Sequence, residues 1–269
     1  MVFTDAFTHP DHDGAMTTIP VLITDKLSKT FATDGVQQHV LRNLDVEICE
    51  GDFTVVMGAS GSGKTTLLYA LSGIDQPTLG EVTFAGTRIT GKSESALARF
   101  RRTHCGFVFQ QLYLLDNMSL MDNAMAAGLL ISKNTKAVAA RADGLFDQVG
   151  IDQATRSKFP AQVSGGEAQR AAIVRALVNS PAVVFADEPT GSLDQTSGTA
   201  VLDAFGQVNH QGQTIVMATH DLKSARRGNR VLYLSDGAIV GDLDLGRYER
   251  DDDEDRNALL RSFLVDMGW

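Results

Sequence analysis

The sequence predicts an α/β fold with a mainly parallel central sheet, an antiparallel β lobe and an inserted α-helical lobe. Three observations support this fold class. Residues 58–65 fill the pattern G-x-x-x-x-G-K-[S/T], which joins a strand to a helix, and they follow the apolar run 53–57. Residues 182–186 are uninterruptedly apolar, as strands buried on both faces of a parallel sheet are. From residue 165 onward, helical and strand-like segments alternate, which is typical of repeating α/β units.

The first part of the chain predicts the antiparallel lobe. Residues 19–27, 39–49 and 81–85 are rich in strand-forming residues and are separated by Gly, Asp and Asn turns. A helix is expected over residues 64–72. We expect the three strands to surround the loop that precedes this helix.

The middle of the chain predicts the helical lobe, over about residues 111–163. Ser119 with Asp122 forms an N-cap pair that opens a helix, and Pro160 breaks the loop that ends the lobe. The predicted elements of the middle segment are helices over 93–103, 119–131 and 135–149 and a strand over 106–110.

The last part predicts the remaining α/β units, which complete a domain over residues 19–245. Residues 1–18 are expected to be a disordered leader, and residues 246–269 an acidic tail in which 258–269 form a short helix that packs on the domain or touches a dimer partner. The predicted elements are helices over 165–179 and 196–210, strands over 182–186, 214–219 and 230–234, and a short helix before the last strand.

Composition narrows the possible partners. The formal net charge is −9, which argues against nucleic acid because phosphate backbones are bound by clustered Lys and Arg. No segment reaches the run of about 18 apolar residues that spans a bilayer.

The glycine-rich loop predicts a nucleoside triphosphate site, with ATP and Mg²⁺ as ligands. Its backbone N–H groups and the following helix N-terminus can surround phosphate oxygens, Lys64 supplies a positive charge, and the Thr65 hydroxyl can bind the metal. The flanking strand and helix favour this interpretation over a merely structural glycine turn. The predicted contacts are Gly58, Ala59, Ser60, Gly61, Ser62, Gly63, Lys64, Thr65 and Thr66.

Two carboxylates follow the buried strand at residues 182–186. Asp187 and Glu188 would emerge at the carboxyl edge of the sheet, where α/β folds bind ligands. The first would hold Mg²⁺ through water, and the second would orient and deprotonate the attacking water. The alternative for such a pair is the start of a helix.

The segment Ser164-Gly165-Gly166-Glu167 predicts a capping box at a helix N-terminus. The two glycines also allow close approach to N–H groups that can bind an anion. Since one nucleotide needs only one phosphate loop, this second anion-facing surface suggests that two copies of the chain share each nucleotide.

These segments, together with Phe109-Gln110, residues 186–194 and Thr219-His220-Asp221, resemble in order and spacing an ATP-binding-cassette (ABC) ATPase, over about residues 19–245. The resemblance implies a P-loop NTPase (RecA-like) core. It implies further that Gln110 senses Mg²⁺ and the attacking water, and that His220 hydrogen-bonds the γ-phosphate.

The resemblance also implies contacts across a dimer. Asp194 would couple the two sites, and Ser164 with Gly166 would cap the γ-phosphate held by the other subunit. Phe31 lies where the family places an aromatic residue against adenine, and a core phenylalanine is the competing interpretation. Val163 and Glu167 differ from the commonest residues of the family at these positions. The glycines Gly165 and Gly166 between them match the family.

Residues 97–111 and Leu114-Leu115 resemble the branch that contains the lipoprotein-release, macrolide-export and bacitracin-type ATPases. A solvated basic helix face is the alternative explanation for Arg99, Arg101 and Arg102. The expected partners are a second copy in an ATP-sandwiched homodimer and integral membrane permease subunits, which would hold the chain at the cytoplasmic face of the membrane. A regulatory ATPase that controls cell-wall hydrolases through a permease-like partner is the alternative function.

Overall fold

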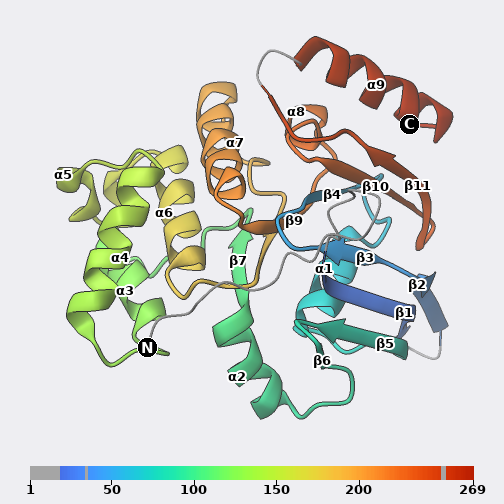
Figure 1. Ribbon diagram of the computed structural model, residues 1–269, viewed down its shortest axis with the longest axis horizontal. Helices are drawn as coiled ribbons and strands as arrows, with labels where there is room; N and C mark the ends of the chain where they lie inside the picture. The colour runs from blue at the N-terminus through green and yellow to red at the C-terminus, as the bar shows by residue number, and fades with distance from the viewer. Residues whose placement is uncertain (1–18, 34–35, 250–252) are drawn as a thin grey trace, which may run out of the picture.

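A computed structural model describes residues 19–33, 36–249 and 253–269. The leader predicted over residues 1–18 lies outside the described residues. A central sheet forms the body, with a helical lobe on one side and a second sheet, the antiparallel lobe, on the other (Figure 1). None of the described helices is long and apolar enough to cross a membrane.

The central sheet confirms the predicted α/β core. Its strand order is β11-β10-β4-β9-β8-β7, and all neighbours are parallel except the β10–β11 pair. The strands are β4 (Phe53–Met57), β7 (Cys105–Phe109), β8 (Val183–Asp187), β9 (Thr214–Ala218), β10 (Arg230–Ser235) and β11 (Ala238–Asp244). Every residue of β4 and β9 is buried, because helices and the second sheet cover both faces.

The antiparallel lobe contains β1 (Pro20–Thr33), β2 (Val36–Leu44), β3 (Glu47–Cys49), β5 (Leu79–Phe84) and β6 (Thr87–Arg88). The single strand predicted over 39–49 is therefore wrong. Asp45 and Val46 separate β2 from β3, and the Asp45 carboxylate accepts the Lys26 N–H at 2.7 Å across this break. Turn bonds of this kind compete with the strand ladder.

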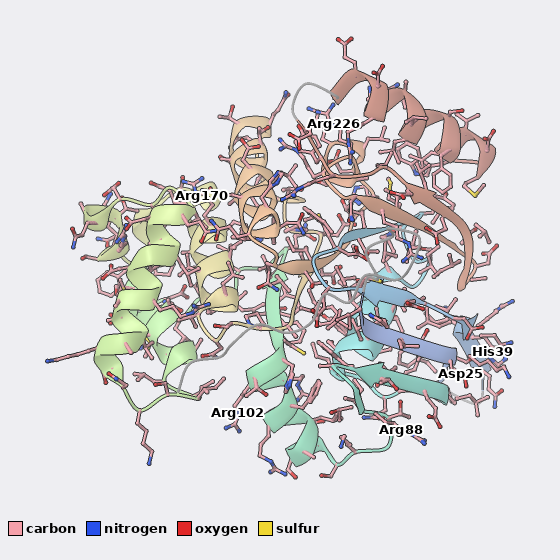
Figure 2. All side chains as sticks on the ribbon, viewed as in Figure 1. Asp25, His39, Arg88, Arg102, Arg170 and Arg226 are labelled. Atoms are coloured by element: carbon pink, nitrogen blue, oxygen red, sulfur yellow. The ribbon has the colours of Figure 1, made fainter. Side chains whose placement is uncertain are left out.

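Helix α1 (Lys64–Ser72) lies where the sequence predicted it, and α2 (Glu94–His104) follows β6. On α2, Arg99 and Arg102 are exposed, and Figure 2 labels Arg102 on this helix. Arg101 instead donates to the Gly73 carbonyl oxygen and pairs with Glu94. It thereby ties α2 to the end of α1, so the basic residues of α2 do not all form a solvated face.

The helical lobe contains α3 (Leu120–Gly128), α4 (Thr135–Gln148), α5 (Gln153–Arg156) and a 3₁₀ turn at Pro160–Gln162. The capping box of Ser119 and Asp122 is confirmed. The helix ends at Gly128, before the predicted residue 131. A Cβ at Gly128 would lie 2.3 Å from Val138 Cγ1 on α4, so the two helices cross closely there. The short helix α5 was not predicted.

Helices α6 (Gly165–Leu177), α7 (Gln195–His210) and α8 (Leu222–Ala225) complete the α/β units. The sequence missed strand β11, which extends the sheet beyond β10 as an antiparallel edge. It also placed the tail helix too late, since α9 (Asp253–Asp266) begins inside the acidic run and lies along β11 (Figure 1). Carboxylates in a first helical turn are favourable because they face the positive end of the helix dipole.

Candidate nucleotide site

The strand register gathers the predicted site at one edge of the central sheet. Phe109 pairs with Asp187, Asp187 with Ala218, and Ala218 with Val56. The residues that follow these strand ends therefore share the carboxyl edge. Parallel strands bind ligands at this edge.

The phosphate loop is shaped by close backbone contacts. A Cβ on Gly58 would lie 2.2 Å from the Leu234 carbonyl oxygen, and one on Gly63 would lie 3.0 Å from the Val40 carbonyl oxygen. Gly63 is the N-cap of α1, with φ +106° and no side-chain hydrogen bond to the helix. The first N–H groups of α1 therefore lack a side-chain cap, which is the arrangement that binds anions.

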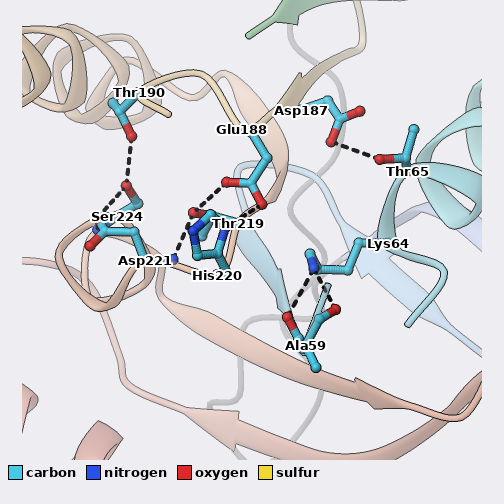
Figure 3. Close-up of polar contacts among 11 residues, drawn as sticks. Ala59, Lys64, Thr65, Asp187, Glu188, Thr190, Thr219, His220, Asp221 and Ser224 are labelled. Carbon is cyan, nitrogen blue, oxygen red and sulfur yellow. Dashed lines mark hydrogen bonds and ion pairs between the residues drawn. The ribbon is translucent and has the colours of Figure 1, made fainter. Parts of the chain in front are cut away.

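Lys64 is buried, with 8% of its surface exposed, and its ammonium group lies over the loop. Nζ donates to the Gly58 and Ala59 carbonyl oxygens at 2.9 and 3.0 Å (Figure 3). Burial lowers the pKa of Lys64, and the Glu188 and Asp187 carboxylates oppose that shift. Charge-assisted binding of phosphate is the chemistry available to this group.

Thr65 and Asp187 form a pair of oxygen donors. The Thr65 hydroxyl donates to Asp187 Oδ1 at 3.1 Å (Figure 3), and burial raises the pKa of Asp187. Hydroxyl and carboxylate oxygens suit Mg²⁺, which commonly takes one or two carboxylates and completes its shell with phosphate and water. Two oxygen donors leave most of the shell to phosphate and water, so this pair fits a metal shared with a nucleotide.

Glu188 is held in a strained backbone conformation. Its φ is +46°, which is uncommon for a residue with a side chain. Its N–H donates to the Ala218 carbonyl oxygen at 2.9 Å, and its own carbonyl oxygen accepts the Gly191 N–H at 3.1 Å. These bonds fix the turn that aims the carboxylate, and such strain clusters at functional sites.

The Glu188 carboxylate has two side-chain partners (Figure 3). Oε1 lies 2.8 Å from His220 Nδ1, and Oε2 accepts the Thr219 hydroxyl at 3.2 Å. An ionised carboxylate only accepts hydrogen bonds, so Nδ1 is the donor and Nε2 remains for another contact. Thr219 belongs to the segment Thr219-His220-Asp221 but was not predicted as a site residue.

Gln110 lies against the same turn. A Cβ on Gly191 would lie 3.1 Å from Gln110 Nε2, so the glycine makes room for this amide. Gln169 on α6 is 1% exposed and donates to the Phe109 carbonyl oxygen at 3.0 Å. This bond ties the helix that follows Ser164 to the strand that precedes Gln110. Sequence reasoning missed Gln169, although its place two residues after the Ser164–Glu167 segment was a usable signal.

A cavity of about 660 Å³ brings most of the predicted contacts together. Two of the lining residues, Val40 and Trp269, were not predicted. The lining consists of Val40, Ala59, Ser60, Gly61, Gly63, Lys64, Thr65, Thr66, Gln110, Glu188, His220 and Trp269.

Other predicted residues lie outside this lining. Ser164 forms the predicted capping box with Glu167, whose carboxylate accepts the Ser164 N–H at 2.8 Å; this bond lowers the pKa of Glu167. Gly165 is exposed beside Ser164 at the same helix start, whereas Gly166 is buried against Ser197 of α7.

Asp194 and Phe31 also lie apart from the cavity lining. The Asp194 carboxylate caps α7 by accepting the Thr196 and Ser197 N–H groups at 2.9 and 3.0 Å. Hydrogen bonds from the Ser197 side chain and from these N–H groups lower the pKa of Asp194. Phe31 is 41% exposed on β1, with Lys29 Nζ 4.9 Å from its ring centre. It is therefore not a core phenylalanine.

The mainly parallel sheet and the phosphate loop at its carboxyl edge define a nucleotide-binding P-loop NTPase. The sequence matches the ABC transporter family over residues 41–191, and the chain belongs to this family as an ABC transporter ATP-binding subunit with ATPase chemistry.

Two relatives carry exporter names. The bacitracin export ATP-binding protein BceA of Halalkalibacterium halodurans is 37% identical over 252 residues, which cover 92% of this chain and 96% of that protein. The macrolide export ATP-binding/permease protein MacB 1 of Aeromonas hydrophila is 40% identical over 223 residues, which cover 83% of this chain and 34% of that protein. The chain thus spans about a third of the length of the second relative. The predicted resemblance to the macrolide-export and bacitracin-type branch is confirmed.

A solved structure supports the fold and the chemistry. A dimeric ATP-binding cassette in a post-hydrolysis state, bound to ADP and Pi, matches with a TM-score of 0.76 and 32% identity, over 84% of this chain and 100% of that chain.

Proposed function

We propose that this chain powers an exporter of lipoprotein, peptide or antibiotic-like substrates, as an ATP-sandwiched homodimer docked on integral membrane permease subunits at the cytoplasmic face of the membrane. The observation that carries the chemistry is the Glu188–His220 pair, which lines the same cavity as Lys64 and Thr65. A positioned base and a phosphate cradle in one cavity support hydrolysis of a bound triphosphate.

In this proposal the attacking water gives its proton to Glu188 as its oxygen bonds the γ-phosphorus. The bond from that phosphorus to the leaving oxygen breaks, which yields ADP and inorganic phosphate. Lys64 binds the outer phosphates, and His220 Nε2 faces the γ-phosphate. Thr65, Asp187 and Gln110 would hold Mg²⁺, which offsets phosphate charge when bound.

The homodimer accounts for the surfaces that lie outside the cavity lining. Ser164 and Gly165 are exposed at a helix N-terminus, where N–H groups favour an anion. A second copy placed head to tail would bring these groups to the nucleotide, and Asp194 and Phe31 would act at that interface and at the base. The solved cassette with 32% identity is described as dimeric, which supports this arrangement.

The permease partner is supported by an exposed apolar surface beside Gln110. Tyr113 is 65% exposed and Leu115 is 51% exposed, in the segment that joins β7 to α3. The Arg175 guanidinium holds this segment through the Leu112 and Tyr113 carbonyl oxygens. Large exposed apolar side chains that lie close together can form the kind of patch that binds a partner protein. The names of the two exporter relatives support the substrate class.

Co-expression with candidate permeases tests the proposed partner. We expect the chain to move to the membrane fraction, and Tyr113→Asp to reduce its membrane-bound share at least about tenfold, since a charge in a buried interface costs several kcal/mol. Leu259→Asp is the matched control, because Leu259 is 55% exposed on α9. Equal membrane recovery of the Tyr113 variant and the control would contradict this docking surface. Absence of the wild-type chain from the membrane fraction would contradict the partner itself.

A further inference from the structure

Trp269 lines the nucleotide cavity together with the phosphate loop, Lys64 and His220. It is the single tryptophan of the sequence, and 49% of its surface is exposed. None of the cassette motifs contains it. Its position requires that α9 is fixed against the domain, which three contacts achieve.

The apolar face of α9 is part of the core. Leu260 and Leu264 are fully buried and belong to the same cluster as Val231 and Tyr233 of β10. A Cβ on Gly241 of β11 would lie 2.6 Å from the Phe263 ring, so only a glycine admits the helix at this distance. The helix is therefore packed on the β10–β11 hairpin rather than detached from it.

The first half of α9 is anchored by Arg256, which is 4% exposed. Its guanidinium donates to the carbonyl oxygens of Arg226 at 3.1 Å and Leu245 at 2.7 Å, and also to that of Gly228. Hydrogen bonds from a buried charged group are stronger than neutral ones. This anchor fixes the helix against the loops on both sides of β10 and β11.

The chain turns back at the end of α9. Gly268 has φ +81°, its N–H donates to the Val265 carbonyl oxygen at 3.0 Å, and the Trp269 N–H donates to the Leu264 carbonyl oxygen at 3.0 Å. This pair of bonds is a Schellman motif, which reverses the chain after a helix and requires a left-handed residue. The reversal fixes the Trp269 backbone to the last turn of α9.

Resting on the nucleotide site described above, we propose that Trp269 is a further nucleotide-contacting residue and that its indole packs against the polyphosphate half of the bound nucleotide. The residues that share the cavity with it belong to the phosphate half of the site, namely the loop, Lys64, Glu188 and His220. Phe31, the proposed adenine contact, does not belong to the cavity lining in the part of the chain that the structure describes. The indole N–H is a donor only, which suits phosphate oxygens.

Because Trp269 is the single tryptophan of these 269 residues, its emission reports this contact directly. Titration with ATP and Mg²⁺ should change the emission spectrum and reduce acrylamide quenching by about twofold. The ATP concentration at half of this change should equal the half-saturation concentration that equilibrium dialysis of labelled ATP gives. Bound ATP by dialysis with unchanged emission and quenching would overturn the proposal and leave the nucleotide site intact. No bound ATP by dialysis would overturn the nucleotide site as well.

A tryptophan moved to another position on α9 distinguishes contact with the nucleotide from movement of the whole helix. Val265 is 71% exposed on α9, so Val265→Trp combined with Trp269→Phe places the single indole on the same helix and toward solvent. Its emission should not respond to ATP. A response equal to that of wild type would mean that the helix moves as a whole, and it would overturn the contact.

Affinity variants test which half of the nucleotide is touched. Trp269→Ala should weaken ATP and GTP by the same factor of about five, since both carry the same polyphosphate and one aromatic contact has this scale. Val265→Ala is the control and should leave both affinities unchanged. A loss for ATP alone would place the indole at the base, and no loss for either nucleotide would remove Trp269 from the site.

Discussion

Glu188 Oε1 lies 2.8 Å from His220 Nδ1, and the hydrogen bond joins the end of β8 to the residue pair that follows β9. Thr219 binds the second carboxylate oxygen at 3.2 Å, so both oxygens of the proposed base are held by the same short segment. Loss of the negative charge at Glu188 would therefore remove the base and also weaken the hydrogen bond that orients His220.

Glu188→Gln should slow ATP hydrolysis by about 10²-fold or more, since a positioned base contributes on this scale. The amide keeps the shape and one acceptor, so ATP affinity should stay within about twofold. Steady-state phosphate release with Mg²⁺ and equilibrium dialysis measure the two effects. Turnover close to that of wild type would show that another group accepts the proton.

Asp187→Asn should stabilise the protein in EDTA at neutral pH while it abolishes Mg²⁺-dependent hydrolysis. Burial raises the pKa of Asp187 above its usual 3.8, so the folded state favours the neutral carboxyl. Its contribution to stability is present below the unfolded-state pKa and is lost as pH rises through the folded-state pKa. Asn is neutral at every pH and can still accept the Thr65 hydroxyl.

Urea unfolding of wild type and Asp187→Asn between pH 3.5 and pH 7 measures this difference. The free energy of unfolding of wild type relative to the variant should fall as pH rises. A difference that is constant with pH, or one that grows in favour of wild type, would contradict the assigned direction.

Ser164→Asp should abolish ATP-driven dimerisation and leave ATP binding to the monomer within about twofold. Aspartate is a good N-cap, so the helix start is retained, but its charge would face the γ-phosphate proposed to be held by the other subunit. Ser164→Asn is the matched control, because it caps without charge and should dimerise. Substitution of Gly166 would be less informative, since its Cβ would lie 2.9 Å from Ser197 Cβ in its own subunit.

Light scattering of both Ser164 variants in a Glu188→Gln background, with ATP, provides the measurement. Equal dimer in the two samples would mean that this helix N-terminus does not meet nucleotide across an interface.

Arg256→Met should lower the free energy of unfolding by about 2–4 kcal/mol, because carbonyl oxygens that a buried guanidinium satisfies would lose their donor. The same substitution also removes the hydrogen bonds that anchor the first half of α9. Arg261→Met is the control on the same helix, because Arg261 is exposed. Urea unfolding that gives the same value for both variants would remove Arg256 from this structural role.

The sequence by itself determined the parallel core, the phosphate loop and the two carboxylates that follow β8. These features depend on local patterns, since Gly58, Gly63 and Lys64 lie within one loop and Asp187 and Glu188 are adjacent. The N-caps at Ser119 and Ser164 were predicted for the same reason: the donor and acceptor lie three residues apart.

The tertiary structure decided what depends on contacts between distant segments. Helix α3 crosses α4 closely at Gly128, where it ends, and β11 is stabilised by pairing with β10 rather than by a strong pattern of its own. The contacts Gln169–Phe109 and Thr219–Glu188 join residues that are far apart in sequence. Trp269 reaches the cavity only because α9 packs on the β10–β11 hairpin, and no local pattern of residues 246–269 specifies that surface.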